Sequence, residues 1–155
     1  MYQEFLEWAE KMNWNITLTA EEAAIPETIK KRYNVPEEWL TFIEHFSVCS
    51  NAADTRWFLT SEDYSNSGAF KWNEFELLTL KAAGLDLSWK KRIKAFWDKH
   101  LPIVMGVGGE YEYYAIDTDS KKVVYGYEPE FEETEVVAES FEVFIKKIIS
   151  GEIVL

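Results

Sequence analysis

Cysteine, positive charge and long apolar runs are all scarce in this chain of 155 residues. Its single cysteine, Cys49, excludes an internal disulfide framework and makes a cytoplasmic location the simplest expectation. No apolar run reaches the length of a membrane span. Lysine and arginine total 16 against 28 aspartate and glutamate residues, so the formal net charge is −12. We therefore expect neither nucleic acid nor an anionic membrane as a partner, because both repel an acidic protein.

Aromatic side chains, by contrast, are abundant: the chain has seven tryptophans, eight tyrosines and ten phenylalanines. That composition favours a packed globule over a disordered chain. The length predicts a single domain over residues 1–155, large enough to bury a hydrophobic core. The stretch MYQEFLEWAEKM is acidic and amphipathic, which is typical of a surface helix and not of a secretory signal.

Apolar periodicity predicts groups of helices and strands. The expected helices cover residues 2–12, 26–32, 36–46, 73–84 and 88–99, with a last one from Ser140. The expected strands cover residues 56–59, 101–107, 110–116 and 122–127. Residues 13–19 are expected to form a connection. This order predicts an α+β fold in one domain, with a central, mainly antiparallel sheet flanked by helices.

The stretch GVGGEYEYYAIDTD, which begins at Gly106, could be a phosphate-binding loop or a turn between strands. A phosphate loop needs glycines between a strand and a helix N-terminus, so that backbone N–H groups face the anion. Here the glycines lie between two predicted strands, and Glu110 and Glu112 would repel a phosphate. We therefore expect Gly106, Gly108 and Gly109 to supply positive-φ backbone for a tight hairpin or a bulge.

One pair of residues could serve nucleophilic catalysis. His45 and Cys49 lie four residues apart and could share a helix face, where the imidazole could activate a thiolate. Glu44 beside them disfavours a thiolate, however, and the apolar neighbours favour a buried, inert cysteine. We expect no catalysis at this pair.

The sequence matches part of the pattern of a calcium-binding loop but not the whole pattern. Asp117, Asp119 and Glu128 fall at loop positions 1, 3 and 12, but Lys121 and Lys122 stand where an oxygen ligand and a glycine are needed. No histidine or cysteine pair has zinc spacing. No two carboxylates stand out as an acid–base pair, so a carboxylate hydrolase is kept only as a minor alternative. The sequence therefore predicts no metal, no cofactor and no catalytic site.

The main candidate for function is the acidic segment YEPEFEETE, residues 127–135, between the last predicted strand and the last predicted helix. Its five carboxylates repel one another unless a cation or a basic partner relieves the repulsion. Aromatic residues within an acidic patch also resemble the anchors of a binding surface. A solvated loop is the alternative. The predicted partner-binding residues are Tyr127, Glu128, Glu130, Phe131, Glu132, Glu133 and Glu135.

A basic cluster stands in contrast to the acidic segment. The stretch SWKKRIKAF places Lys90, Lys91 and Arg92 in the first turn of a predicted helix, where the helix dipole disfavours cations. We expect another interaction to hold them, and an internal pairing with the acidic segment is the favoured one.

Three stretches together resemble the SUKH superfamily, the Smi/Knr-type domains found in fungal cell-wall regulators and bacterial immunity proteins. They are IPETIKKRYNVPEEWLTFIEHF, LPIVMGVGGEYEYYAIDT, and KKVVYGY followed by EVVAESFEVFIKKII, and they span roughly residues 20–150. The chain departs from the family pattern after Phe46, where SVCSNAAD replaces a glycine-rich turn. Its two helices between residues 73 and 99 also look longer than usual.

The resemblance implies an α+β fold and no catalysis. It implies a non-enzymatic immunity protein that binds and neutralises a cognate toxin with a basic surface, often a nuclease. A regulatory adaptor for a cellular protein unrelated to toxins is the alternative that the fungal relatives suggest. Because the family supplies no fixed binding residues, the acidic segment is the predicted contact with the toxin.

Overall fold

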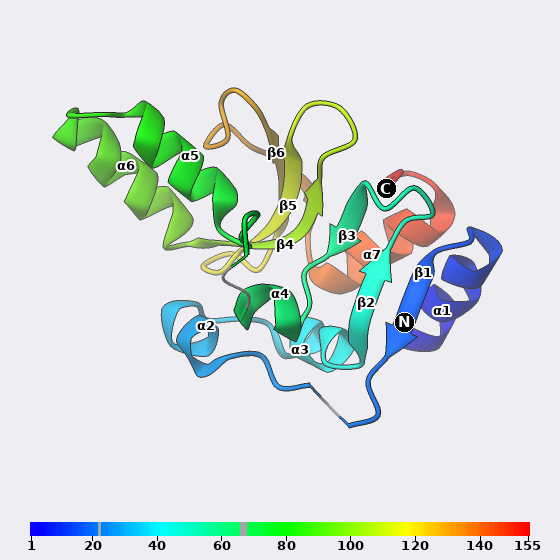
Figure 1. Ribbon diagram of the computed structural model, residues 1–155. Coiled ribbons are helices and arrows are strands. Elements are labelled where there is room, and N and C mark those ends of the chain that lie inside the picture. Colours follow the sequence, from blue (N-terminus) through cyan, green and yellow to red (C-terminus); the bar gives the residue numbers. More distant parts are fainter. Residues whose placement is uncertain (22, 66–67) are drawn as a thin grey trace.

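A seven-stranded antiparallel sheet runs through the computed structural model, which describes residues 1–21, 23–65 and 68–155 (Figure 1). The strands are β1 (Asn15–Leu18), β2 (Phe46–Ser50), β3 (Arg56–Phe58), β4 (His100–Gly106), β5 (Glu112–Asp117), β6 (Val123–Tyr127) and β7 (Glu135–Ala138), and their order in the sheet is their order in the chain. The helices are α1 (Tyr2–Lys11), α2 (Glu27–Arg32), α3 (Glu37–Ile43), α4 (Ser61–Ser65), α5 (Glu74–Ala82), α6 (Leu87–Trp97) and α7 (Phe141–Ser150). The predicted α+β fold with a central antiparallel sheet is confirmed.

Helices cover both faces of the sheet, and two neighbouring tyrosines of β5 show how. Successive side chains on a strand point to opposite faces. Tyr113 contacts Trp97 of α6, with ring centroids 5.0 Å apart, whereas Tyr114 contacts Phe144 of α7 at the same distance. The apolar strand β4 lies between these two layers, and its residues from Leu101 onward are buried. Its unbroken apolar sequence therefore follows from burial on both faces.

The last helix, α7, forms where the sequence predicts it. Ser140 caps its N-terminus by accepting a hydrogen bond from the backbone N–H of Val143. Its buried stripe consists of Phe141, Phe144, Ile145 and Ile148. Gly151 ends it in the left-handed conformation, with φ of 82°, as a glycine at this position commonly does.

Helices α5 and α6 form an antiparallel pair that extends from the sheet at the end opposite to α1 (Figure 1). Their inner ends are fixed by buried Phe75 and Trp97, but Leu85 and Leu87 at the outer turn are exposed. The helix α6 begins at an Asp86 cap, whose carboxylate accepts from the N–H of Trp89, and not at the predicted Ser88. None of the helices in the described ranges is long and apolar enough to cross a bilayer.

Three strands differ from the sequence-based expectation. Residues 15–18 form the edge strand β1, although we expected a connection there. The predicted helix over residues 36–46 ends at Ile43, and Phe46 begins β2. Trp39, Phe42 and Ile43 of α3 and Phe46 of β2 are buried in the same core, so the periodicity does not mark the change from helix to strand. The second edge strand, β7, begins inside the acidic segment.

The glycine-rich stretch is a turn between β4 and β5, as predicted, but for a different reason. None of Gly106, Gly108 and Gly109 has a positive φ. Two of them are needed for close approach instead. An added Cβ at Gly106 would lie 2.7 Å from Cγ of Glu112, and one at Gly108 would lie 2.9 Å from Cβ of Thr55. The expectation of positive-φ backbone was wrong.

Candidate functional site

The acidic segment, residues 127–135, connects β6 to β7, and one of its aromatic rings packs into the body of the protein. Phe131 is 5% exposed and stacks on Phe75 of α5, with centroids 4.5 Å apart and an angle of 9° between the planes. The hydroxyl of Tyr113 donates a hydrogen bond to the Phe131 carbonyl oxygen. Phe131 therefore belongs to the core, and its predicted role as an exposed anchor is corrected: its ring is unavailable to a partner.

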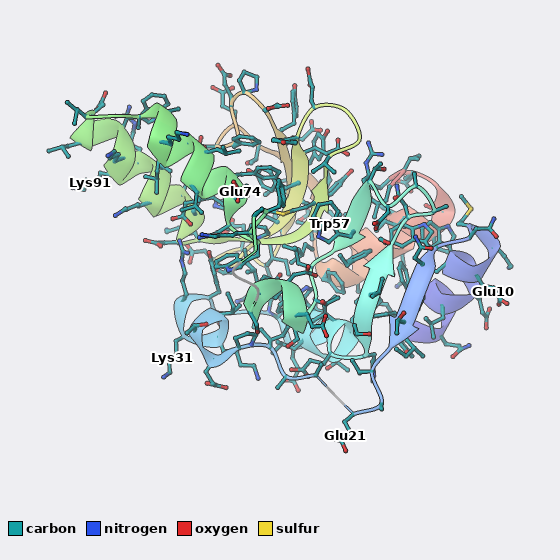
Figure 2. The ribbon with its side chains drawn as sticks, in the orientation of Figure 1. Glu10, Glu21, Lys31, Trp57, Glu74 and Lys91 are labelled. Atoms are coloured by element: carbon teal, nitrogen blue, oxygen red, sulfur yellow. The ribbon has the colours of Figure 1, made fainter. Side chains whose placement is uncertain are left out.

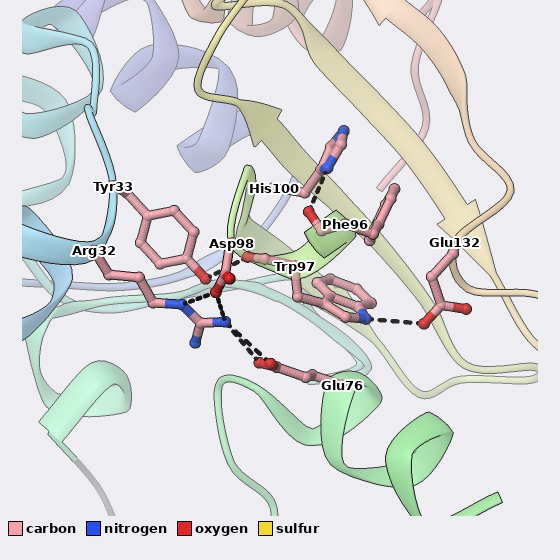
Figure 3. Close-up of polar contacts among 8 residues, drawn as sticks. All are labelled: Arg32, Tyr33, Glu76, Phe96, Trp97, Asp98, His100 and Glu132. Atoms are coloured by element: carbon pink, nitrogen blue, oxygen red, sulfur yellow. Dashed lines mark hydrogen bonds and ion pairs between the residues drawn. The ribbon is translucent and has the colours of Figure 1, made fainter. Parts of the chain in front are cut away.

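Two of the five glutamates are occupied by contacts within the protein. Glu128 accepts a hydrogen bond from the backbone N–H of Tyr111 at 2.9 Å, and its own N–H donates to the Tyr111 carbonyl at 2.9 Å. Glu132 accepts from the indole N–H of Trp97 at 3.0 Å (Figure 3). These two carboxylates hold the segment in place, so we assign them a structural role in addition to their charge.

The remaining charge of the segment faces solvent. Glu130, Glu133 and Glu135 are exposed, and none of them forms an ion pair within the described ranges. The Tyr127 side chain is 51% exposed and lies 5.6 Å from the ring of Tyr125. Three carboxylates and one aromatic ring of the predicted set are therefore exposed to solvent.

A cluster of ion pairs centred on Arg32, called the clamp below, lies next to Trp97, the residue that binds Glu132 (Figure 3). The Arg32 guanidinium pairs with Glu76 of α5 and with Asp98 at the end of α6, each at 3.0 Å. Glu76 is 7% exposed, so its ion pair with Arg32 is largely buried. Beside the clamp, the Tyr33 hydroxyl donates to the Trp97 carbonyl at 2.8 Å. This hydrogen bond fixes Trp97, whose indole N–H donates to Glu132.

The basic residues of α6 do not neutralise the acidic segment. In the described ranges no ion pair links Lys90, Lys91 or Arg92 to any carboxylate, and Arg92 donates to the Ser88 hydroxyl at 3.1 Å. The predicted internal pairing of the two clusters is therefore wrong. Within residues 1–21, 23–65 and 68–155, no basic side chain forms an ion pair with the acidic segment.

His45 and Cys49 do not share a helix face. Cys49 lies on β2 and is 2% exposed, and burial raises the pKa of its thiol. His45 lies outside the helix and contacts the ring of Tyr2 at 4.5 Å. No group of histidine, cysteine and carboxylate side chains suited to a metal ion occurs in residues 1–21, 23–65 and 68–155. Asp117 and Asp119 instead belong to the turn between β5 and β6, where Asp117 accepts from the Asp119 N–H.

A pocket of about 650 Å³ was not predicted. It opens between β2, β3, α4 and the start of β5. Its half-buried aromatic residues are Trp57, Phe70 and Tyr111, and its acidic residues are Asp54, Glu62 and Asp63. In the view of Figure 2, Trp57 lies between Glu74 of α5 and the α1 end of the molecule.

The sequence gives no local signal for this pocket. Its lining residues come from separate segments between residues 47 and 111, and only the folded sheet brings them together. Burial raises the pKa of Asp63, whose carboxylate nevertheless accepts hydrogen bonds from the N–H and hydroxyl of Thr60. The pocket adjoins the acidic segment through Tyr111, which pairs with Glu128.

Comparison with models of known protein families and with curated proteins gives no significant match.

Proposed function

We propose that this protein is a non-enzymatic immunity protein, which binds a toxin with a basic surface and blocks it through the acidic segment. The observation that carries the proposal is the exposure of Glu130, Glu133 and Glu135 on a segment whose backbone is fixed by buried contacts. The resemblance to the SUKH superfamily supplies the expectation of a toxin. A basic domain, such as a nuclease that itself binds an anionic substrate, has the surface charge that this segment would attract.

The fixed backbone supports tight binding in addition to attraction. A segment that is ordered before binding loses less conformational entropy when the complex forms. The buried ring of Phe131 and the bond from Trp97 to Glu132 provide that order. Exposed carboxylates would then raise the association rate, and added salt would lower it.

Affinity capture followed by a growth assay tests this function. The protein is used as bait in lysate of its own cells at low and high salt, and the captured partner is then expressed with or without it. We expect a basic partner that binds better at low salt and arrests growth unless the protein is co-expressed. Partners that do not affect growth would contradict the toxin proposal and favour the regulatory adaptor.

A matched pair of triple variants locates the contact. Glu130→Gln, Glu133→Gln and Glu135→Gln together remove three exposed charges from the acidic segment. Glu7→Gln, Glu10→Gln and Glu21→Gln remove three exposed charges elsewhere. We expect the first variant to lose protection and the second to keep it. Equal protection by both would show that the acidic segment is not the contact.

A further inference from the structure

We propose that the pocket between β2, β3 and α4 binds an organic cation, namely the guanidinium or ammonium group of a basic side chain on the protein partner. The source of the cation rests on the proposed function, whereas the chemistry of the pocket does not. Three properties of the pocket favour a cation: aromatic walls, carboxylates with no basic side chain among the described lining residues, and walls that are fixed before binding.

The aromatic walls surround the cavity at steep angles to one another. Phe70 lies between the other two rings, with its centroid 5.9 Å from that of Trp57 and 5.9 Å from that of Tyr111. The planes meet at 68° and 72°. All three rings line the pocket and are only partly buried. Aromatic ring faces attract alkylammonium and guanidinium groups, and the attraction grows as water is excluded.

Carboxylates supply the charge that selects a cation. Asp54, Glu62 and Asp63 line the pocket, and no lysine, arginine or histidine of the described residues does so. The nearby Arg56 is held by Glu112 outside the lining. Lys71 is exposed and lines only a small adjoining cavity. A neutral apolar ligand would gain nothing from these charges, whereas a cation would gain from each of them.

The ends of the pocket are fixed by hydrogen bonds. At one end the Asn51 side chain accepts from the N–H groups of Thr55 and Arg56, at 2.8 Å and 3.2 Å. The Thr55 carbonyl accepts from the N–H of Val107, which joins this turn to the one containing Gly108. At the other end Thr60 donates twice to Asp63, at 2.7 Å and 3.0 Å. The cavity is thus preformed, and its volume is ordinary for a ligand site.

The position of the pocket suits a partner attracted by the acidic segment. Tyr111 forms one wall of the pocket and exchanges two hydrogen bonds with Glu128 at the start of the segment. The pocket and the start of the acidic segment therefore share Tyr111 as a neighbour. A basic side chain of the partner, inserted into the pocket, would contact the aromatic rings there. The ring of Phe131 is buried and offers the partner no such contact.

Titration with small cations tests the pocket without any toxin. The probes are capped arginine (Nα-acetyl-arginine amide), its neutral analogue capped citrulline, and choline as a free quaternary amine. The readout is the indole N–H signal of Trp57 in a ¹⁵N-labelled protein, assigned with Trp57→Phe. We expect capped arginine to shift this signal saturably and to bind about tenfold more tightly than capped citrulline.

Charge variants supply the control. Asp54 has φ of 54°, a conformation that asparagine also adopts, and Glu62 is exposed, so Asp54→Asn with Glu62→Gln should leave the fold intact. We expect this double variant to weaken capped arginine at least about threefold, because two attractive charges are lost. Glu7→Gln with Glu10→Gln removes the same charge from α1 and should change nothing.

Each alternative result overturns a defined part of the inference. Equal binding of citrulline, or an unmoved Trp57 signal, would show that the pocket does not select a cation. Stronger binding of choline than of capped arginine would indicate that the pocket binds a free quaternary ammonium compound and not a side chain of the partner. Failure of the titration alongside intact toxin capture would refute the pocket and leave the proposed function standing. Cation binding by a protein that protects against no toxin would refute the proposed function and leave the pocket standing.

Discussion

Arg32 joins three helices through one guanidinium group. It ends α2, pairs with Glu76 of α5 and reaches Asp98 at the end of α6, while its carbon atom Cζ lies 5.1 Å from the Tyr33 ring centroid. The two ion pairs differ in environment, because Glu76 is nearly buried and the Asp98 side chain is 62% exposed. Their contributions to stability should therefore differ as well.

Replacing each acid by its amide separates the two contributions. Glu76→Gln leaves a partly buried guanidinium without its main partner, and we expect a loss of about 1–2 kcal/mol in the free energy of unfolding. Asp98→Asn changes an exposed pair and should cost less than about 0.5 kcal/mol. Urea denaturation of both variants measures the difference. Equal losses would show that burial does not determine how much each ion pair of Arg32 contributes to stability.

Buried tyrosines predict sensitivity to alkaline pH. Burial, together with the nearby Glu112 carboxylate, raises the pKa of Tyr114 from 10.0 to about 12. The unfolded chain therefore releases the Tyr114 proton at a lower pH than the folded protein does. The stability from this group is complete below pH 10 and is lost as the pH rises toward 12, by about 1 kcal/mol between pH 10 and 11.

Tyr114→Phe tests this dependence, because the Tyr114 hydroxyl forms no hydrogen bond in the described part of the chain. We expect the variant to lose about 1 kcal/mol less than the wild type between pH 10 and 11. Unfolding in urea at the two pH values gives the comparison. An unchanged pH dependence would mean that Tyr114 titrates alike in the folded and unfolded states.

At the scale of elements, periodicity predicted the long, strongly patterned segments and failed where two elements share one core. The stripe of α7 and the β4–β5–β6 meander formed as expected. The spacing from Trp39 to Phe46 suits one helix, yet the chain turns after Ile43 and Phe46 enters β2. Both edge strands were missed because they are short and carry polar residues, as edge strands often do.

The candidate site was predicted in its charge and not in its geometry. The sequence shows five glutamates around two aromatic residues, but not which of these residues points inward. Phe131 is buried because Phe75 of α5 offers it a flat partner, a contact between residues far apart in the sequence. The pocket was missed altogether, since its walls lie on segments that no sequence pattern connects.

Two glycines of the β4–β5 turn provide a matched test of close approach. An alanine Cβ at Gly108 would lie 2.9 Å from Cβ of Thr55, whereas one at Gly109 meets no atom within 4 Å. We expect Gly108→Ala to cost about 1–3 kcal/mol, because the two turns must separate. Gly109→Ala should be nearly neutral. Thermal unfolding of the two variants provides the measurement, and similar losses would contradict the explanation.

Gly126 performs a similar function for the acidic segment. An added Cβ would lie 2.6 Å from the Tyr113 ring, whose hydroxyl donates to the Phe131 carbonyl. Tyr113 is fully buried, so its ring cannot move aside without cost. We expect Gly126→Ala to destabilise the protein by about 2–3 kcal/mol and to increase hydrogen exchange in residues 127–135. Unchanged exchange in that segment would show that Tyr113 does not fix it.

At the scale of the whole molecule, charge is unevenly divided. Residues 81–99 carry six basic and two acidic side chains, a net charge of +4, so the remainder of the chain carries −16. The basic residues lie mainly on α6, which projects from the sheet (Figure 1). Among the residues that the structure describes, none of them pairs with the acidic segment. A partner therefore meets an acidic body with its charge largely unbalanced.

Association kinetics test most directly whether a partner binds through the acidic segment. The rate constant for binding the captured partner is measured by stopped flow from low to high salt, for the wild type and for both triple glutamine variants. We expect a rate that falls steeply with salt and a shallower dependence after Glu130→Gln, Glu133→Gln and Glu135→Gln. The control variant with Glu7→Gln, Glu10→Gln and Glu21→Gln should show no change. A rate that is independent of salt, or equally affected by both variants, would contradict binding through the acidic segment.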